Sequence, residues 1–539
     1  MSLDRQAVDV WSMTDDRYRN WPVVYVLDGK KTVYVGESLN VAGRLRQHIE
    51  SDTKASLTGA RVIVDERFNK SACLDLESWL IQMFAGDGKY EVLNRNDGIA
   101  NADYFDRAAY QSRFQDVFAA LKAEGLFKND SVEAIENENL FKLSPFKALT
   151  DDQRDSVAEI VTSFFQNLAS GTTSQTVIEG EPGTGKTVVA IFLLKLLADI
   201  KASDDEADPH ESTSMFSSFF TPKHRDQLSG VEFGIVIPQQ ALRNSVKKVF
   251  KQVSGLHPSM VVDPFSVGKS GKHYDLLIVD EAHRLSQRSQ QASGVQNGDF
   301  KRINVDLFAA DSPDYTQLDW IEQRSSHQIL LVDAKQTVRP GDLPADTVGT
   351  LLNDAREAGR FFKLKTQHRV AAGDDYVAYI RAVLSDEKPQ PLDFGDYDVR
   401  FFDDIGQMES AIRTSEAEEG LSRLLAGYAW KWASKDDSSA YDIAIGNNRY
   451  RWNSTLVDWI ASPGSIDEVG SIHTTQGYDL NYAGVIIGKD LRYDPSEQRM
   501  LFDRSHYFDA RGKANNKQRG ITYGDDDILD YIRNVYAVL

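Results

Sequence analysis

The sequence has little cysteine, no long apolar run and fewer basic than acidic residues. Cys73 is the single cysteine among 539 residues, which excludes an internal disulfide and a zinc cluster built from cysteines. This scarcity is typical of proteins in the reducing cytoplasm, and Cys73 itself is expected to be a small core residue. No run of about 18 apolar residues occurs, and the N-terminus lacks the apolar segment of a signal peptide. We therefore expect neither secretion nor a membrane-spanning helix.

The chain carries 81 acidic and 61 basic residues, a formal net charge of −20. This balance argues against uniform electrostatic attraction to nucleic acid, because phosphate contacts require clustered lysine and arginine. The acidic residues concentrate in expected loops, such as 203–212 and 414–420, so a local basic groove stays compatible with the total. The length predicts about three or four domains, and the 41% hydrophobic residues are enough for several cores.

The pattern of apolar residues predicts an α/β protein with four regions. Residues 1–105 form a small α/β unit, in which a hairpin of 23–27 and 32–36 precedes two helices, and 106–145 form a helical connector. From residue 149, strands alternate with helices, which is the signature of a parallel sheet covered on both faces. The expected domains are 146–336, with a polar surface insertion near 201–229, and 337–539. The expected strands are 175–180, 233–238, 275–280, 328–333, 442–446, 469–475 and 482–488.

The segment GEPGTGKT is a phosphate-binding loop (P-loop) pattern that follows an expected strand and precedes an apolar helix. Its glycines let backbone N–H groups close around phosphate oxygens, and the helix N-terminus adds positive potential. Lys186 would neutralise the β and γ phosphates, and the Thr187 hydroxyl would ligate Mg²⁺. The segment therefore predicts binding of ATP and Mg²⁺ by Gly180, Glu181, Pro182, Gly183, Thr184, Gly185, Lys186 and Thr187.

An acidic pair, Asp280 and Glu281, closes the strand-like run at 275–280. At that position Asp280 would reach the magnesium ion, and Glu281 would orient or deprotonate the attacking water. An acidic pair at the end of a strand can also cap a following helix. The presence of the P-loop favours the catalytic interpretation.

The order of the motifs LTDDQ, GEPGTGKT, VIPQQ, VDEAH, LVDAKQ, KTQHR and IHTTQGYDLNYAGVIIG resembles superfamily one helicases. More narrowly, it is similar to the bacterial helicase-like family grouped with the Schlafen proteins, from about residue 146 to the end. The resemblance implies two RecA-like P-loop lobes that close on ATP and move along DNA or RNA.

The resemblance assigns four residues around the nucleotide. Gln153 would read the adenine edge from upstream of the P-loop. Gln336, with Asp333 beside it, would sense the γ-phosphate and couple it to the strand-binding surface. Arg369 would project from the second lobe onto the γ-phosphate.

The resemblance also implies residues that link ATP to nucleic acid. Gln476 and Gly477 would lie at the interface of the lobes, and Pro238 and Gln239 near the sugar-phosphate backbone. In this family the helix resembling ILDYIRNVYAVL leads into a further motif with another arginine. The sequence is therefore expected to end, at Leu539, before the last motif of the second lobe, which would favour ATP binding over rapid turnover.

The N-terminal unit resembles the GIY-YIG nucleases over about residues 22–105. Val23-Val24-Tyr25 corresponds to the first triplet and Tyr34-Val35-Gly36 to the second, with a spacer of eight residues between them. The first triplet lacks the family's glycine, and the spacer is short. Asn94 matches a late asparagine of the family, and Asn96 is an alternative.

The nuclease resemblance implies a metal-dependent site for phosphodiester cleavage. Tyr25 would act as general base or position water, assisted by the hydroxyl of Tyr34 and by His48 as a possible auxiliary. Arg44 would hold the phosphate, and Glu77 would be the single protein ligand of a largely hydrated Mg²⁺.

Together these features predict an ATP-dependent helicase or translocase fused to a metal-dependent endonuclease, in defence or repair. The alternative is a nucleotide-switched regulatory ATPase whose N-terminal unit binds nucleic acid without cleaving it. A plain DNA-binding scaffold would require both sites to be inactive. DNA and RNA are equal alternatives as the partner, and every oligomeric state stays open.

Overall fold

The structure, a computed structural model, separates into two compact units. The first comprises Met1–Val161, Ile191–Gly230 and Ser245–Met260, and the second comprises Thr162–Ala190, Val231–Asn244 and Val261–Leu539. No helix within the described part of the chain is long and apolar enough to cross a membrane. The described residues are 1–95, 103–203, 215–289, 291, 293–366, 373–455, 459–475 and 480–539.

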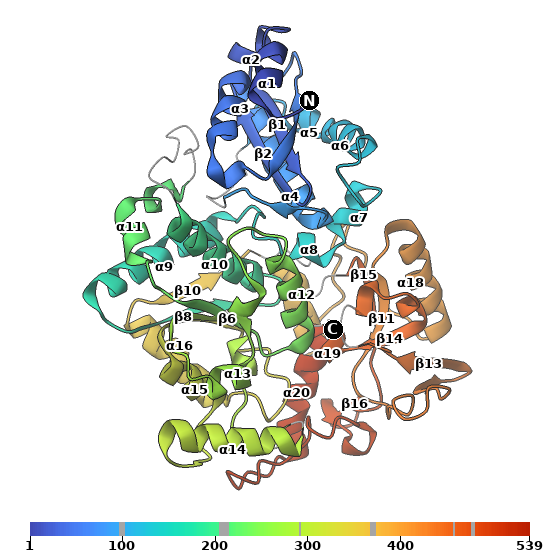
Figure 1. The fold of residues 1–539 in the computed structure, drawn as a ribbon. Coiled ribbons are helices and arrows are strands. Elements are labelled where there is room, and N and C mark those ends of the chain that lie inside the picture. The colour runs from blue at the N-terminus through green and yellow to red at the C-terminus, as the bar shows by residue number, and fades with distance from the viewer. Residues whose placement is uncertain are drawn as a thin grey trace. The chain divides into compact units, whose positions relative to one another are not determined.

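The first unit contains a four-stranded sheet in the order β3-β1-β2-β4. Its strands β1 and β2 are labelled in Figure 1. The predicted hairpin is confirmed, because β1 and β2 pair antiparallel with Tyr25 opposite Gly36. Asp28 and Gly29 still belong to β1, so the turn is shorter than predicted. The strands are β1 (Val23–Gly29), β2 (Thr32–Ser38), β3 (Leu57–Ile63) and β4 (Glu91–Val92).

Helices of this unit pack apolar side chains against the hairpin. Asn40 caps the N-terminus of α3 by accepting a 3.0 Å hydrogen bond from the amide of Gly43. Leu45 of α3 packs in one buried cluster with Tyr25 and Tyr34. The two predicted helices are confirmed. The helices here are α1 (Arg5–Trp11), α2 (Arg17–Asn20), α3 (Val41–Glu50) and α4 (Lys70–Asp87).

The range expected to be a connector, 106–145, contains helices. It holds α5 (Arg107–Gln111), α6 (Phe114–Ala123), α7 (Val132–Glu136) and α8 (Asn139–Lys142), and α9 (Asp151–Ser170) follows. The described part of the expected insertion contains a 3-10 helix (Ser217–Phe219) and α11 (Pro222–Gln227). Phe216 and Leu228 are fully buried, so this part is anchored by apolar side chains and is not simply a polar surface loop.

The second unit contains a six-stranded parallel sheet in the order β10-β5-β9-β8-β6-β7. Figure 1 labels its strands β10, β8 and β6. The four strands predicted here are confirmed as β5 (Ser174–Gly180), β6 (Phe233–Val236), β8 (Tyr274–Val279) and β9 (Ser325–Val332). β7 (Val261–Val262) and β10 (Phe361–Leu364) were not predicted. Since β10 pairs with β5, the sheet continues past the expected boundary at 336–337.

Apolar residues on both faces explain why these strands form a covered parallel sheet. The helix after β5, α10 (Lys186–Ala202), is buried on nearly every side from Val189 to Ile200, as expected of a helix that is apolar all round. The other helices next to these strands in sequence are α12 (Gln240–Phe250), α13 (Pro264–Lys269), α14 (Gly294–Phe308), α15 (Gln317–Arg324) and α16 (Ala345–Glu357).

A five-stranded sheet, in the order β12-β13-β14-β11-β15, follows in the same unit. The predicted strands correspond to β12 (Ile443–Ile445), β14 (Glu468–Ser471) and β15 (Tyr482–Ile486), and α19 (Ile472–Thr475) replaces the second half of the one expected at 469–475. The remaining elements are β11 (Ser422–Ala426), β13 (Asn448–Trp452), β16 (Leu491–Asp494), β17 (Arg499–Phe502), α17 (Gly373–Val383), α18 (Ile405–Glu419) and α20 (Asp525–Val538). The α/β class is confirmed.

Helix α20 is fixed to the loop after β15 by a buried carboxyl group. The hydroxyl of Tyr536 donates a 2.7 Å hydrogen bond to Asp490 Oδ1 and accepts one of 3.0 Å from the amide of Gly488. Burial raises the pKa of Asp490 to about 6, and the hydrogen bond from Tyr536 offsets this only in part. One of the contacts that hold α20 is therefore titratable.

Candidate nucleotide-binding site

The P-loop lies between β5 and α10, where glycines are required. Gly183 and Gly185 have φ angles of 82° and 77°, in the left-handed region that favours glycine. A Cβ on Gly180 would lie 2.4 Å from Thr184 Oγ1. The loop is therefore tightly closed and leads directly into the N-terminus of a helix, as the sequence predicts for a phosphate site.

Lys186 is folded over its own loop. Its Nζ donates hydrogen bonds of 2.6 Å to the carbonyl of Gly180 and 3.0 Å to that of Glu181. The same Nζ lies 3.8 Å from Asp333 Oδ2. Thr184 supports the loop by donating a 2.9 Å hydrogen bond to the carbonyl of Glu181. A phosphate bound here would compete for an ammonium that is already in place.

Thr187 and Asp280 meet at the start of α10. Thr187 Oγ1 donates a 2.7 Å hydrogen bond to Asp280 Oδ2, and Asp280 is fully buried just after β8. Burial and the neighbouring Glu281 carboxylate raise the pKa of Asp280. No group of three or more His, Cys, Asp or Glu side chains in the described residues could hold a metal alone. A hydroxyl and a carboxylate suit Mg²⁺, which usually keeps phosphate and water among its ligands.

Glu281 is held by a histidine that was not predicted to belong to the site. Its φ of 51° is rare for a residue with a side chain. The ring of His283 accepts a 3.1 Å hydrogen bond at Nδ1 from the amide of Asp333, so its proton lies on Nε2. That nitrogen is 3.1 Å from Glu281 Oε2.

Burial acts to raise the pKa of Glu281, but the nearby Nε2–H of His283, followed by the charge of Lys186, outweighs it and lowers the pKa. Glu281 therefore stays a carboxylate, the form that can orient or deprotonate water.

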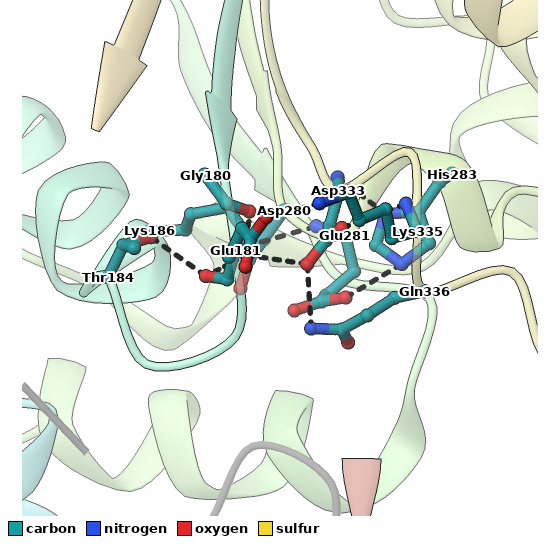
Figure 2. A network of polar contacts seen from close by, with 10 residues as sticks. All are labelled: Gly180, Glu181, Thr184, Lys186, Asp280, Glu281, His283, Asp333, Lys335 and Gln336. Carbon is teal, nitrogen blue, oxygen red and sulfur yellow. Dashed lines mark hydrogen bonds and ion pairs between the residues drawn. The ribbon is translucent and has the colours of Figure 1, made fainter. Parts of the chain in front are cut away.

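The turn after β9 brings a third set of polar groups to the site (Figure 2). Gln336 Nε2 donates a 2.8 Å hydrogen bond to Asp333 Oδ2, and the amide of Lys335 donates one of 2.9 Å to Asp333 Oδ1. The Nζ of Lys335 reaches Glu181 Oε1 at 2.7 Å. Lys335 and His283 both lie inside motifs that the sequence had shown, LVDAKQ and VDEAH. Their place in those motifs was the signal that could have identified them.

Four further residues were predicted to belong to the nucleotide site. Arg369, Gln476 and Gly477 lie outside the described residues. Gln153 is 3% exposed, and its Oε1 accepts a 3.1 Å hydrogen bond from the amide of Thr150 at the start of α9. It is therefore a buried capping residue rather than a surface glutamine, and its contact with adenine stays a prediction.

The family model of the Schlafen group 3, DNA/RNA helicase domain matches residues 173–539, more than half of the chain. The chain belongs to this family. The matched range contains every strand of the six-stranded and five-stranded sheets. A relative in Saccharomyces cerevisiae, the uncharacterized protein YPL245W, is 26% identical over an alignment of 393 positions that covers 67% of this chain and 78% of that protein. The helicase-like part of the sequence resemblance is confirmed.

The first unit holds a second candidate site, whose centre lies before the range matched by the Schlafen helicase domain. His48 Nε2 lies 2.7 Å from the hydroxyl of Tyr25, and His48 Nδ1 lies 2.9 Å from the Nζ of Lys54. An ammonium can only donate, so Nδ1 accepts and the ring proton is on Nε2, facing Tyr25. Burial, followed by the charges of Lys54 and Arg44, lowers the pKa of His48 to about 2.

The two tyrosines of the predicted triplets lie close to this histidine. The rings of Tyr25 and Tyr34 are 6.3 Å apart, and the Nζ of Lys54 lies 3.7 Å over the ring of Tyr34. A Cβ on Gly36 would lie 2.4 Å from the hydroxyl of Tyr25. Glycine at this position therefore leaves room for the Tyr25 ring. Lys54 was not predicted, because it follows α3 outside the motif.

The remaining predicted nuclease residues lie on neighbouring elements. Arg44 precedes His48 by one turn of α3, and its Nη1 donates a 3.0 Å hydrogen bond to Gln47. Glu77 lies on α4. The side chain of Asn94 donates to and accepts from the backbone of Val35, at 2.7 and 3.1 Å, which holds β2 in place. Asn96 lies outside the described residues.

Proposed function

We propose that this protein is an ATP-dependent helicase or translocase that acts on nucleic acid. The hydrogen bond between Thr187 and Asp280 carries the proposal, because it joins the P-loop to the acidic pair in one magnesium-ready site. The match to the Schlafen DNA/RNA helicase domain supports the same function. In this proposal Lys186 binds the phosphates, Mg²⁺ takes Thr187 and Asp280 as ligands, and Glu281 activates water.

Contact with nucleic acid is proposed at the end of β6. The side-chain oxygen and nitrogen of Gln239 are shielded from solvent, and neither has a hydrogen-bond partner in the described residues. An amide in this state is ready to bond a sugar-phosphate backbone or a base. Gln336, Arg369, Gln476 and Gly477 are proposed to couple that contact to ATP, with Gln153 at the adenine.

The first unit is proposed to be a Mg²⁺-dependent endonuclease. The cluster of Tyr25, Tyr34 and His48 supports this, because it places two phenols beside a histidine of defined tautomer. Arg44 would hold the scissile phosphate, and Glu77 would ligate the metal. A motor joined to a nuclease suits defence against foreign nucleic acid or repair.

The competing proposal is a nucleotide-switched ATPase whose first unit binds nucleic acid without cutting it. The net charge of −20 and the valine at the first position of the Val23-Val24-Tyr25 triplet favour it. The two proposals differ in whether cleavage products form.

The test is cleavage of single-stranded, duplex and forked DNA and RNA with Mg²⁺, with and without ATP. We expect Glu77→Ala and Arg44→Ala to abolish cleavage and to leave ATP hydrolysis intact. Lys186→Ala should abolish ATP hydrolysis alone. Glu50→Ala is the matched control, since Glu50 is an exposed carboxylate on α3 that pairs with Arg5. Unchanged cutting by both nuclease variants would refute the site, and no cutting by the wild-type protein would favour the switch.

A further inference from the structure

Lys335 brings a second ammonium group to the P-loop, in addition to Lys186. We propose that Lys335 determines specificity for a nucleoside triphosphate over a diphosphate, and that Glu181 and the terminal phosphate compete for its ammonium group. This inference rests on the proposed ATPase function. Its basis is the ion pair of 2.7 Å between Lys335 Nζ and Glu181 Oε1, which joins the turn after β9 to the P-loop (Figure 2).

The backbone of Lys335 is held by Asp333, whereas its side chain is largely exposed to solvent. Asp333 accepts hydrogen bonds from the amide of Lys335 at 2.9 Å and from the side chain of Gln336 at 2.8 Å. The Lys335 side chain is 58% exposed, and that of Glu181 is 34% exposed. An ion pair this exposed contributes little to stability, so exchanging one anionic partner for another costs little.

The charges around Glu181 keep its carboxyl group ionised, so that Glu181 and a bound phosphate would compete for Lys335. Burial acts to raise the pKa of Glu181, and the hydrogen bond and charge of Lys335 outweigh it, so the pKa lies below its usual value. Glu181 therefore stays ionised, next to the loop that would receive the phosphates. A triphosphate brings more negative charge to this place than a diphosphate does, and it would compete more strongly for the ammonium.

Lys186, which is also proposed to bind the phosphates, is the less accessible of the two ammonium groups. It is 5% exposed and already bonded to the carbonyls of Gly180 and Glu181, at the base of the loop. Lys335 shares its turn with Gln336, the residue predicted to sense the γ-phosphate. Both side chains of this turn would then recognise the terminal phosphate, one as an amide and one as a cation.

The test compares Mg²⁺ complexes of a fluorescent non-hydrolysable ATP analogue and fluorescent ADP by equilibrium titration. For Lys335→Met we expect the Kd of the triphosphate to rise about tenfold, as for the loss of a charged hydrogen bond, and that of the diphosphate to change little. The same tenfold loss of selectivity should occur in a Glu181→Gln background. If Lys335→Met causes no loss of selectivity in the Glu181→Gln background, Lys335 acts only by neutralising Glu181, and the proposal is overturned.

Lys272→Met is the matched control, because Lys272 forms an exposed ion pair of 2.8 Å with Glu232 in the same unit. It should leave both Kd values unchanged. Equal losses for both nucleotides, or no loss, in Lys335→Met would overturn the proposal. Failure of the proposed ATPase is a separate result: the wild-type protein would bind neither nucleotide, or Lys186→Ala would bind as tightly as wild type.

Discussion

Thr187 donates a hydrogen bond of 2.7 Å to Asp280, and this contact links the helix after the P-loop to the strand that carries the acidic pair. The two residues are far apart in sequence, yet each was assigned to magnesium on its own motif. The structure brings them together.

Replacing Asp280 by Asn tests the charge at this contact. The amide oxygen can still accept the hydrogen bond from Thr187, so the fold should persist. Hydrolysis of ATP should fall about 100-fold, because Mg²⁺ loses its anionic protein ligand. Steady-state hydrolysis over a range of Mg²⁺ concentrations measures this, with the unfolding midpoint as the control. Equal turnover by the variant and wild type at every concentration would contradict the assignment.

The Gly36→Ala variant should destabilise the first unit by about 1–3 kcal/mol, since the new methyl group would meet the ring of Tyr25 in a packed core. Cleavage should fall with it. Urea unfolding followed by circular dichroism measures the loss. Gly298→Ala is the control, because a Cβ there meets nothing within 4 Å. A Gly36→Ala protein as stable as wild type would show that the Tyr25 ring can lie elsewhere.

Lys195 and Asp199 form a buried ion pair on α10, with side chains 1% and 8% exposed. Lys195→Met leaves the carboxylate of Asp199 buried without its cation and should cost about 3–5 kcal/mol of unfolding free energy. The double variant Lys195→Met/Asp199→Leu should recover most of that loss, because apolar pairs of similar volume replace such ion pairs well. Chemical denaturation of both variants gives the comparison. A double variant less stable than the single one would mean that the pair contributes more than it costs.

The contact of Asp490 with Tyr536 predicts a pH dependence of stability. Burial raises the pKa of Asp490 to about 6, whereas an unfolded chain has about 3.9. The folded protein then binds the extra proton, so the stabilising contribution is complete below about pH 4 and is lost as pH rises through 6. The loss amounts to about 3 kcal/mol.

The measurement is the difference in unfolding free energy between wild type and Asp490→Asn at pH 4, 5, 6 and 7. The unfolding free energy of the variant should rise relative to that of the wild type up to about pH 6, and the difference should then stay constant. A difference that stays flat across this range would show that Asp490 titrates normally.

The strands of the six-stranded sheet could be predicted where a long apolar run ended in polar residues, as at β5 and β8. In the five-stranded sheet, β11 could not be predicted, although it pairs with both β14 and β15. Arg423 interrupts its short apolar run. The structure explains this arginine: it is buried, with hydrogen bonds to Ser465 and to the carbonyl of Ile460. A buried charge of this kind interrupts the apolar pattern of a strand. Its burial could not be predicted, because its partners come from distant parts of the chain.

The same reason limited prediction of the site. The P-loop and the acidic pair are local motifs whose chemistry follows from residue order. The ion pair of Lys335 with Glu181 and the contact of His283 with Asp333 join residues from different motifs. The short apolar strand β10, which follows an exposed helix end, was also missed because four residues carry too weak a pattern.

A nucleic-acid-dependent ATPase is tested most directly by measuring ATP hydrolysis by the whole chain with and without single-stranded DNA or RNA. At least one polymer should accelerate hydrolysis, and Lys186→Ala should remove both the basal and the stimulated rate. Hydrolysis that no polymer stimulates, or that persists in Lys186→Ala, would contradict this function.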